Sequence, residues 1–504
     1  MSLCLTALAP HAVIPATPRY FPNLVSHHEA GGATYLQRYY LNDTAFGGPG
    51  SPIFMIMGGE GAIPPTTGFF YPWVVDVLAP RFKALVIEPE HRFYGESLPF
   101  GNASYDNDKM QLLTPEQALA DAVALLVATR KARNCSVAPR CPVITFGGSY
   151  PGWMSAMMRL RYPAVVDGAY AASAPMRFYA QQLDQYEYYR VVTDSARRVS
   201  SGCPAAVRAA LRLLGATTAE LTAKLGLCTP LPPYVSAGGD AMLRRELDMV
   251  FSYTFAGLNM GNYPPSAQTG LARACARFEA GAGSVDGQWE SLHALLHGDL
   301  LRGGARGRHG HGLAPMPTSP PMRGVVEAPV EAAGACFSLQ GQAPSGANGT
   351  ISCGDWSGCG TGTNGRSWDY ETCTLLVEPI GTNGETDMFP PRPWSLAWMR
   401  GHCEARFGVA PAPTRLVDAW GFDAAGLVRQ RASRIVFTNG LQDGWSAGGY
   451  LTDVSPELEL LTLNMVNGAH HSDLSHSLPG PEDTPDVVAA RANATVILER
   501  WLQA

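Results

Sequence analysis

One stretch of the sequence decides the fold: Thr145-Phe146-Gly147-Gly148-Ser149-Tyr150-Pro151-Gly152-Trp153. The apolar run at residues 142–146 predicts a buried strand, and residues 153–160 have the pattern of a helix. A glycine-rich turn between strand and helix presents a serine on a strained backbone, which requires small neighbours on both sides. The amide after Ser149, at the start of the helix, can stabilise an oxyanion. Ser149 is therefore a candidate nucleophile, and the alternative is an ordinary serine in a glycine-rich turn.

Further apolar runs end in glycine or polar clusters, as buried parallel strands do. They lie at residues 52–57, 84–87, 434–437 and 458–463. Helical patterns lie between them. Residues 114–117 form a capping box with proline at the first helical position, and Thr484-Pro485 opens a helix at the end of the chain. This alternation predicts an α/β fold with a doubly wound, mostly parallel sheet.

The middle of the chain has a different pattern. No comparable strand run occurs between about residues 178 and 300, where 205–214 and 241–250 look helical. Residues 303–365 are rich in Gly, Pro, Ser and Ala, which is typical of a long surface loop. We therefore divide the chain into an N-terminal segment (1–34), a first core part (35–177), a mainly helical cap insertion (178–365) that includes this loop, and a second core part (366–504).

Composition excludes several function classes. The 504 residues are 46% hydrophobic, which rules out wholesale disorder, and no apolar run is long enough to span a membrane. The net charge of −6 gives no electrostatic footprint for nucleic acid. The segment RGGARGR at 302–308 lacks the interleaved aromatic residues of an RNA-binding segment. The sequence leaves open whether the chain forms a homodimer.

Cysteines and glycosylation sequons indicate the secretory pathway, ending in a lysosome or vacuole or outside the cell. Eleven cysteines are present, none in a C-x-x-C pair, so they do not suggest zinc, and ten remain when Cys4 is set aside. The N-x-S/T sequons are at Asn42, Asn102, Asn134, Asn348 and Asn493. Residues 1–9 are apolar without a basic start, so we interpret them as a degenerate or truncated signal peptide. The alternative is an intracellular enzyme with buried thiols.

A serine hydroxyl needs a base, and the base needs an orienting carboxylate. In this fold class the chain order is Ser, Asp, His. Asp443 and His470 supply that order, each on a loop after a predicted strand, where catalytic groups collect in open α/β sheets. The spacing does not decide between His470 and His471. The rival acids are Asp473, which lies close to the histidines in sequence, and Asp453.

Several separated motifs resemble one family of serine exopeptidases, which includes lysosomal Pro-X carboxypeptidase, dipeptidyl peptidase II and thymus-specific serine protease. The resemblance covers most of residues 35–176 and 366–502. The motifs are QRYY at 37–40, GEG at 59–61, EHRFYGES at 90–97, GGSY at 147–150, AASAP at 171–175, DMF at 387–389, NGLQDGW at 439–445 and GAHH at 468–471.

The resemblance implies an α/β-hydrolase core with an inserted helical cap, and the triad Ser149, Asp443 and His470. It implies a disulfide between Cys373 and Cys403. It also implies cleavage of peptides next to proline, which releases either a C-terminal residue after Pro or an N-terminal dipeptide. No cofactor or metal is implied. The chain departs from the family at four positions outside the triad: the family usually has Asn at position 59, Gly at 151, Pro at 444 and Leu at 472.

Other residues are candidates for binding. The amide of Tyr150 and a second donor in the Gly58–Gly61 turn, assigned to Gly59, would hold the oxyanion. Trp153 and Trp445 would line a proline pocket, or else pack in the core. Glu60 and Glu90 would hold a peptide terminus, or else brace loops, and we expect His91 to be structural. The competing functions are a serine esterase or other serine carboxypeptidase on the same fold, and a catalytically silent binding protein.

Overall fold

The computed structural model describes residues 17–29, 31–65, 68–298, 336–344, 350–475 and 479–503. Cys4, the predicted signal segment at 1–9, the sequon at Asn348 and most of the Gly/Pro-rich loop lie outside the described residues. Within the described residues, no helix is both long and apolar enough to cross a membrane.

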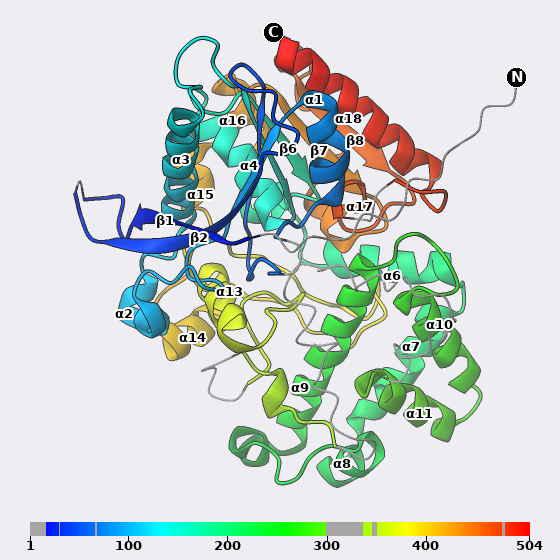
Figure 1. Ribbon diagram of the computed structural model, residues 1–504. Helices are drawn as coiled ribbons and strands as arrows, with labels where there is room; N and C mark the ends of the chain where they lie inside the picture. Colours follow the sequence, from blue (N-terminus) through cyan, green and yellow to red (C-terminus); the bar gives the residue numbers. More distant parts are fainter. Residues whose placement is uncertain are drawn as a thin grey trace, which may run out of the picture.

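An eight-stranded sheet forms the core (Figure 1). Its order is β1-β2-β4-β3-β5-β6-β7-β8, and all pairings from β4 to β8 are parallel. The strands are β1 (Arg19–Leu24), β2 (Thr34–Asn42), β3 (Ile53–Ile56), β4 (Leu85–Pro89), β5 (Val143–Gly148), β6 (Gly168–Ala172), β7 (Ile435–Gly440) and β8 (Leu460–Met465). The predicted α/β class with a mostly parallel sheet is confirmed. The sheet starts before residue 35, because β1 pairs antiparallel with β2.

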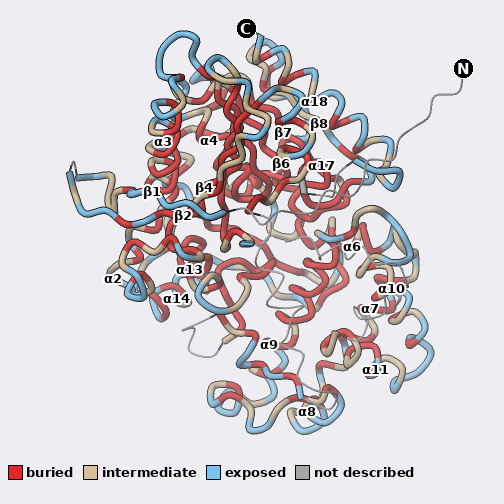
Figure 2. The backbone as a smooth tube through the Cα atoms, viewed as in Figure 1, coloured by how far each residue is buried: buried red, intermediate tan, exposed pale blue. Residues whose placement is uncertain are grey.

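Helices cover both faces of the sheet. Alternate residues of each strand point to opposite faces. Thus Met55 packs in a cluster with α3 (Pro115–Ala132) and α4 (Tyr150–Arg161), while Phe54 packs in another with α18 (Pro485–Gln503). The strands β3, β4, β5, β6 and β7 are wholly buried between these layers, whereas β1, β2 and β8 carry exposed or half-buried residues (Figure 2). Thr114 caps α3 as predicted, since its hydroxyl accepts from the Gln117 amide at 3.4 Å.

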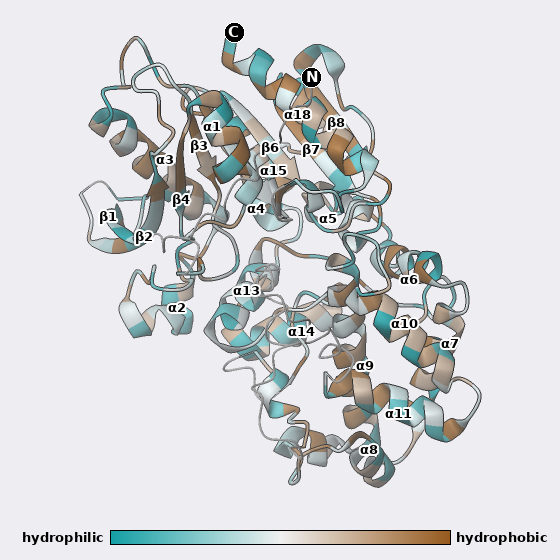
Figure 3. Cartoon of the chain, turned by 45° about the vertical axis from the view of Figure 1, so that its right-hand side comes forward, coloured by the Kyte–Doolittle hydropathy of each residue, from teal (hydrophilic) through white to brown (hydrophobic). Residues whose placement is uncertain are grey.

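A mainly helical cap lies between β6 and β7 in the chain. Its longest described element, α9 (Pro233–Met260), carries a hydrophobic face (Figure 3).

The other α-helices of the described residues, in the core as well as in the cap, are α1 (Ala79–Phe82), α2 (Asn107–Met110), α5 (Met176–Tyr179), α6 (Glu187–Val199), α7 (Cys203–Leu211), α8 (Thr218–Leu225), α10 (Gly270–Gly281), α11 (Val285–Leu296), α13 (Gly362–Thr374), α14 (Leu396–Phe407), α15 (Arg415–Trp420), α16 (Ala424–Arg429) and α17 (Ser472–Ser475).

The end of α9 reaches the loops that follow β7 and β8. The Asn259 amide oxygen accepts from the Gly444 N–H at 2.9 Å, and the Met260 carbonyl accepts from the His470 N–H at 3.3 Å. The cap therefore covers the carboxyl ends of the strands, where catalytic groups of open α/β sheets collect.

Disulfides tie both parts of the chain. Cys373 and Cys403 are joined, the pair that the family resemblance implies, and they link α13 to α14. Four more disulfides are present: Cys135–Cys141, Cys203–Cys275, Cys228–Cys336 and Cys353–Cys359. All ten cysteines other than Cys4 are therefore paired, which is typical of proteins that fold in an oxidising compartment.

Candidate active site

Ser149 lies on a sharp turn between β5 and α4. Its backbone has φ 65° and ψ −133°, a conformation that a non-glycine residue adopts only where the surroundings enforce it. The enforcing contacts are visible on both sides. The Ser149 N–H donates to the Ala172 carbonyl at 2.9 Å, and a Cβ at Gly147 would lie 2.0 Å from the Pro151 carbonyl oxygen. The sequence expectation of small neighbours around a strained serine is thus met.

His470 is hydrogen-bonded to Asp443 and not to the rival acids. His470 Nδ1 lies 2.6 Å from Asp443 Oδ2, and the other carboxylate oxygen accepts from the Trp445 N–H at 3.1 Å. A carboxylate beside Nδ1 keeps the proton on that nitrogen and leaves Nε2 as the acceptor. His470 Nε2 is buried and has no hydrogen-bond partner among the described residues. It therefore remains available to take a proton.

The rival acids have other partners. Asp473 accepts from the hydroxyls of Tyr170 and Thr438, the latter at 2.6 Å. Asp453 accepts the Thr462 N–H at 2.7 Å, at the edge strand β8. Neither is hydrogen-bonded to His470 among the described residues, so geometry favours Asp443.

His471 joins the two halves of the site. Its ring lies 4.2 Å, centroid to centroid, from that of His470, and a Cβ at Gly148 would lie 2.7 Å from its ring. Its N–H donates to the Ser173 hydroxyl at 2.9 Å. Burial lowers the pKa of His471 well below its usual value, so the ring is neutral. His471 thus packs the histidine loop against the residue that precedes Ser149.

The turn after β3 packs against Pro151, two residues after Ser149, since a Cβ at Gly59 would lie 2.4 Å from Pro151 Cγ. A Cβ at Gly58 would lie 2.1 Å from the Pro89 carbonyl oxygen, so this turn has no room for side chains on that face. The Gly59 N–H has no acceptor among the described residues. A free N–H in a tight turn is the kind of donor that an oxyanion site requires.

Two residues predicted to bind substrate are buried against other protein groups. Trp153 is fully buried, and its ring stacks on Trp420 at 5.6 Å and meets the edges of Tyr179 and Phe422. Its interpretation as a pocket wall is therefore replaced by core packing, the alternative that its helical position also allowed. A residue on the inner face of α4 is turned into the core beneath the turn.

Glu90 braces loops. One oxygen accepts from the Arg38 guanidinium and the Ile63 N–H, and the other from the Glu96 N–H and the Ser97 hydroxyl. A buried carboxylate with both oxygens occupied cannot also hold a peptide terminus. The expectation that Glu90 binds substrate is thus not supported.

Trp445 is 5% exposed and lies beside the acid. Its ring packs against Phe178 at 5.4 Å and Tyr188 at 5.0 Å, and its N–H donates to Met260 Sδ at 3.3 Å. These contacts join the acid loop to the cap.

Glu60 belongs to an acidic cluster that sequence reasoning did not find as a whole. Burial raises the pKa of Glu60 to about 7, the field of His470 lowers it and that of Asp355 raises it. Burial, with the charge of Asp355, raises the pKa of Glu378 well above its usual value. Among the described residues none of the three pairs with a lysine or arginine. We call Glu60, Asp355 and Glu378 the acidic cluster.

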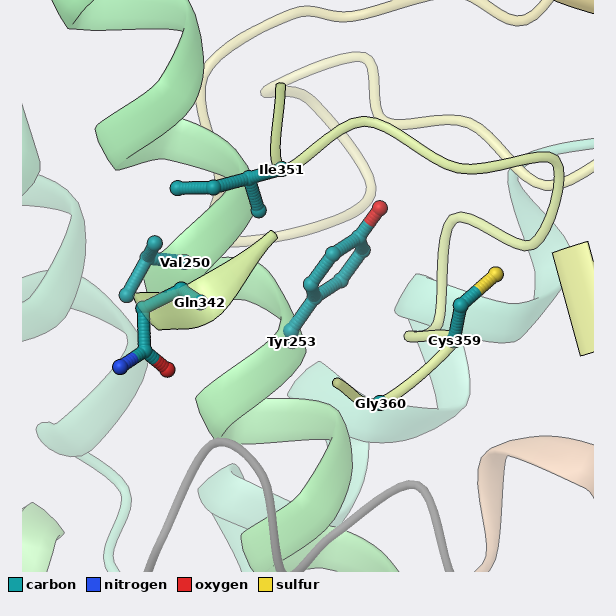
Figure 4. Close-up of a pocket in the computed structure, with 6 residues that line it drawn as sticks. All are labelled: Val250, Tyr253, Gln342, Ile351, Cys359 and Gly360. Atoms are coloured by element: carbon teal, nitrogen blue, oxygen red, sulfur yellow. The ribbon is translucent and has the colours of Figure 1, made fainter. Parts of the chain in front are cut away.

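A separate small pocket lies within the cap and does not include the site. It is lined by residues of α9 and of the segment that follows the loop, among them Tyr253 and Ile351 (Figure 4). None of the predicted site residues lines it.

Comparisons with known proteins agree with the sequence resemblance. A family model described as serine carboxypeptidase S28 matches residues 26–238 and 327–494. Lysosomal Pro-X carboxypeptidase of Mus musculus is 30% identical over 497 residues, covering 96% of this chain and 88% of the relative. The Homo sapiens protein of that name is 29% identical over 496 residues, with the same coverage. Thymus-specific serine protease of Homo sapiens is 29% identical over 488 residues, covering 93% and 83%. The predicted family resemblance is confirmed.

Proposed function

Since this chain belongs to the serine carboxypeptidase S28 family, and is a serine-type peptidase, we propose that it is an exopeptidase that cleaves peptides next to proline with Ser149, His470 and Asp443 as its triad. One observation carries the assignment of the triad. His470 is bound through Nδ1 to Asp443 and keeps a free Nε2, in a site that also holds a strained serine at the head of α4.

The chemistry follows from these positions. His470 Nε2 removes the Ser149 hydroxyl proton as the oxygen attacks the peptide carbonyl, and the resulting imidazolium gives that proton to the leaving amine. Asp443 holds the Nδ1 proton and stabilises the imidazolium. Water, deprotonated by the same histidine, then attacks the acyl carbonyl, and the imidazolium returns the proton to the Ser149 oxygen as the acid product leaves. The amides of Tyr150 and Gly59 donate to the oxyanion in both halves of the reaction.

The acidic cluster favours one end of the substrate. Burial raises the pKa of all three carboxyl groups, and Glu60, whose pKa is about 7, generates a negative potential beside His470 once it ionises. Such a potential attracts a substrate ammonium group and repels a terminal carboxylate. We therefore assign the enzyme to the dipeptidyl-peptidase type, which binds a free N-terminus. A Pro-X carboxypeptidase activity is the second candidate, and the names of the most similar relatives support it.

Its substrates would be proline-containing peptides in the secretory or lysosomal pathway. Five disulfides fit an oxidising route, and relatives named lysosomal fit its end point. The described sequon residues Asn102, Asn134 and Asn493 are exposed and Asn42 is half-buried, so each is proposed as a glycan site.

Two experiments test the proposal. A fluorophosphonate probe should label the wild type and fail to label Ser149→Ala, and labelling of that variant would refute the nucleophile. Hydrolysis of a free-amine Ala-Pro amide, compared with an N-blocked Pro-X peptide, then separates the two exopeptidase types. Cleavage of only the blocked peptide would refute the dipeptidyl assignment. Cleavage of neither, with turnover of simple esters, would establish the esterase alternative.

A further inference from the structure

Four buried side chains form a hydrogen-bond network behind the nucleophile turn. Tyr150, at the start of α4, places its hydroxyl oxygen 3.1 Å from His91 Nε2 and 3.0 Å from Glu371 Oε1. The Tyr94 hydroxyl lies 2.6 Å from Glu371 Oε2. His91 and Tyr94 come from the loop after β4, and Glu371 comes from α13. None of these groups has a part in the chemistry of the triad.

The positions of the protons follow from the partners. His91 Nδ1 lies 2.8 Å from the Arg92 carbonyl oxygen, which can only accept, so Nδ1 carries a proton. Burial lowers the pKa of His91 to about 4, and therefore the ring is neutral and Nε2 is an acceptor. The single proton of the Tyr150 hydroxyl must then point to His91.

Glu371 is left to supply the other hydrogen bond. With the Tyr150 proton on His91, the 3.0 Å contact between the Tyr150 oxygen and Glu371 Oε1 needs a proton on the carboxyl group. Glu371 Oε2 is then the carbonyl-type oxygen, which accepts from Tyr94. One donor and one acceptor are what a neutral carboxylic acid offers. Burial and the charge of Glu60 raise the pKa of Glu371 to about 8.

We propose that Glu371 is a positioning residue that works as a protonated acid, and that its hydrogen bond to the Tyr150 hydroxyl fixes the residue whose backbone amide serves the oxyanion. The proposal rests on the function proposed above. When Glu371 ionises, both of its oxygens accept, the Tyr150 proton turns toward the carboxylate, and His91 Nε2 loses its donor. The oxyanion site is then expected to loosen.

The surrounding charges do not offset this ionisation. Glu60 is the charged neighbour, and it opposes a second negative charge. The Arg92 guanidinium is bound to Asp121, with contacts of 2.7 Å. Among the described residues, Glu371 has no lysine or arginine partner. His91 Nε2 lies 3.9 Å from Glu371 Oε1, but burial lowers the pKa of His91 to about 4, so that ring is neutral. The ionised state is therefore left without a charged counterion.

Glu371→Gln separates the possibilities, because an amide also offers one donor and one acceptor on the same skeleton. We expect its kcat at pH 5 to stay within about twofold of wild type, and its activity to hold above pH 8, where wild-type kcat falls. Glu371→Leu, which removes the donor, should lower kcat at every pH with little change in KM.

Thermal unfolding tests the protonation independently of activity. The folded wild type retains a proton that the unfolded chain loses above pH 4.5, so wild-type stability is lost as the pH rises toward 8. The melting temperature of Glu371→Gln, relative to that of wild type, should therefore increase as the pH rises from 4.5 to 8. A difference in melting temperature between the two proteins that does not change with pH would overturn the protonated state. A tenfold or larger loss of kcat in Glu371→Gln at pH 5 would also overturn it, because that loss is expected when an ionised Glu371 faces a charged His91. Unchanged kcat in a folded Glu371→Leu would overturn the positioning role. Failure of the triad itself would appear only in the Ser149 labelling experiment.

Discussion

Gly59 and Pro151 occupy one space. A Cβ built at Gly59 would lie 2.4 Å from Pro151 Cγ, closer than real contacts allow, and 3.1 Å from Pro151 Cδ. The proline ring thus fills the position that a side chain at residue 59 would take. These are two of the four positions at which this chain departs from the family pattern. Because the two residues are in contact, the two departures depend on each other: proline at 151 leaves room only for glycine at 59. The Pro151 ring holds the turn that carries the proposed second oxyanion donor.

The first prediction follows from this contact. Gly59→Ala should destabilise the fold by about 1–3 kcal/mol through overpacking, and should lower kcat more than it raises KM, because the displaced turn carries the Gly59 amide. Pro151→Gly in the same chain should restore both properties. Chemical denaturation and steady-state kinetics on the two single variants and the double variant measure the coupling. Additive effects would contradict a shared space.

The second prediction separates the two buried acids near the histidines. Asp443→Asn should lower kcat by about 10⁴-fold while the protein stays folded, because the wrong tautomer of His470 then faces Ser149. Asp473→Asn is the matched control. Asp473 accepts from Tyr170 and Thr438, so its loss should lower the melting temperature and spare most of kcat. A reversal of these two outcomes would transfer the role of orienting acid to Asp473.

The third prediction concerns Trp153, where the structure replaced a binding role by packing. Trp153→Ala should cost about 3–5 kcal/mol of stability, because the ring is fully enclosed. Trp153→Phe should keep KM for a proline substrate within about twofold of wild type. Trp420→Phe, which alters the stacked partner, is the control and should behave alike. A large rise in KM for Trp153→Phe at an unchanged melting temperature would show instead that Trp153 contacts the substrate.

The sequence predicted five of the eight strands, the edge strand β8 among them, and missed β1, β2 and β6, whose patterns are weaker. The strands β3, β5 and β7 are buried on both faces, so each forms a continuous apolar run. In contrast, β2 alternates buried and exposed residues near the sheet edge, and β6 reads Gly-Ala-Tyr-Ala-Ala, whose small residues give little strand signal. A strand that is buried on both faces is therefore easier to predict from the local sequence than one that alternates or consists of small residues.

The same limit applies to the site. Chain order and loop position were enough to nominate Ser149, Asp443 and His470, because each follows a recognisable strand. Asp355 lies in the last part of the cap insertion and Glu371 lies in α13 just after it, and neither follows a strand. A single carboxylate has no sequence signature of burial. Only the arrangement in space showed that these acids lie beside Tyr150 and Glu60.

Glu60 provides the fourth prediction, which concerns pH. Its pKa rises from an ordinary 4.5 to about 7 on folding, since burial disfavours the charged form. The folded state thus holds a proton that the unfolded chain releases, and about 3 kcal/mol of stability is present below pH 4.5 and is lost as the pH rises to 7. For the proposed amine-binding role the sign is opposite, because only ionised Glu60 attracts an ammonium group.

We therefore expect KM for a free-amine dipeptidyl substrate to fall as the pH rises from 5 toward 7, while the melting temperature declines. Glu60→Gln should flatten both curves, leaving KM high at pH 7 and the melting temperature less dependent on pH. An N-blocked ester of the same residues is the control substrate, since its KM should not respond to the substitution. Equal responses of the amine and the blocked substrate would show that Glu60 acts on the histidine and not on the substrate terminus.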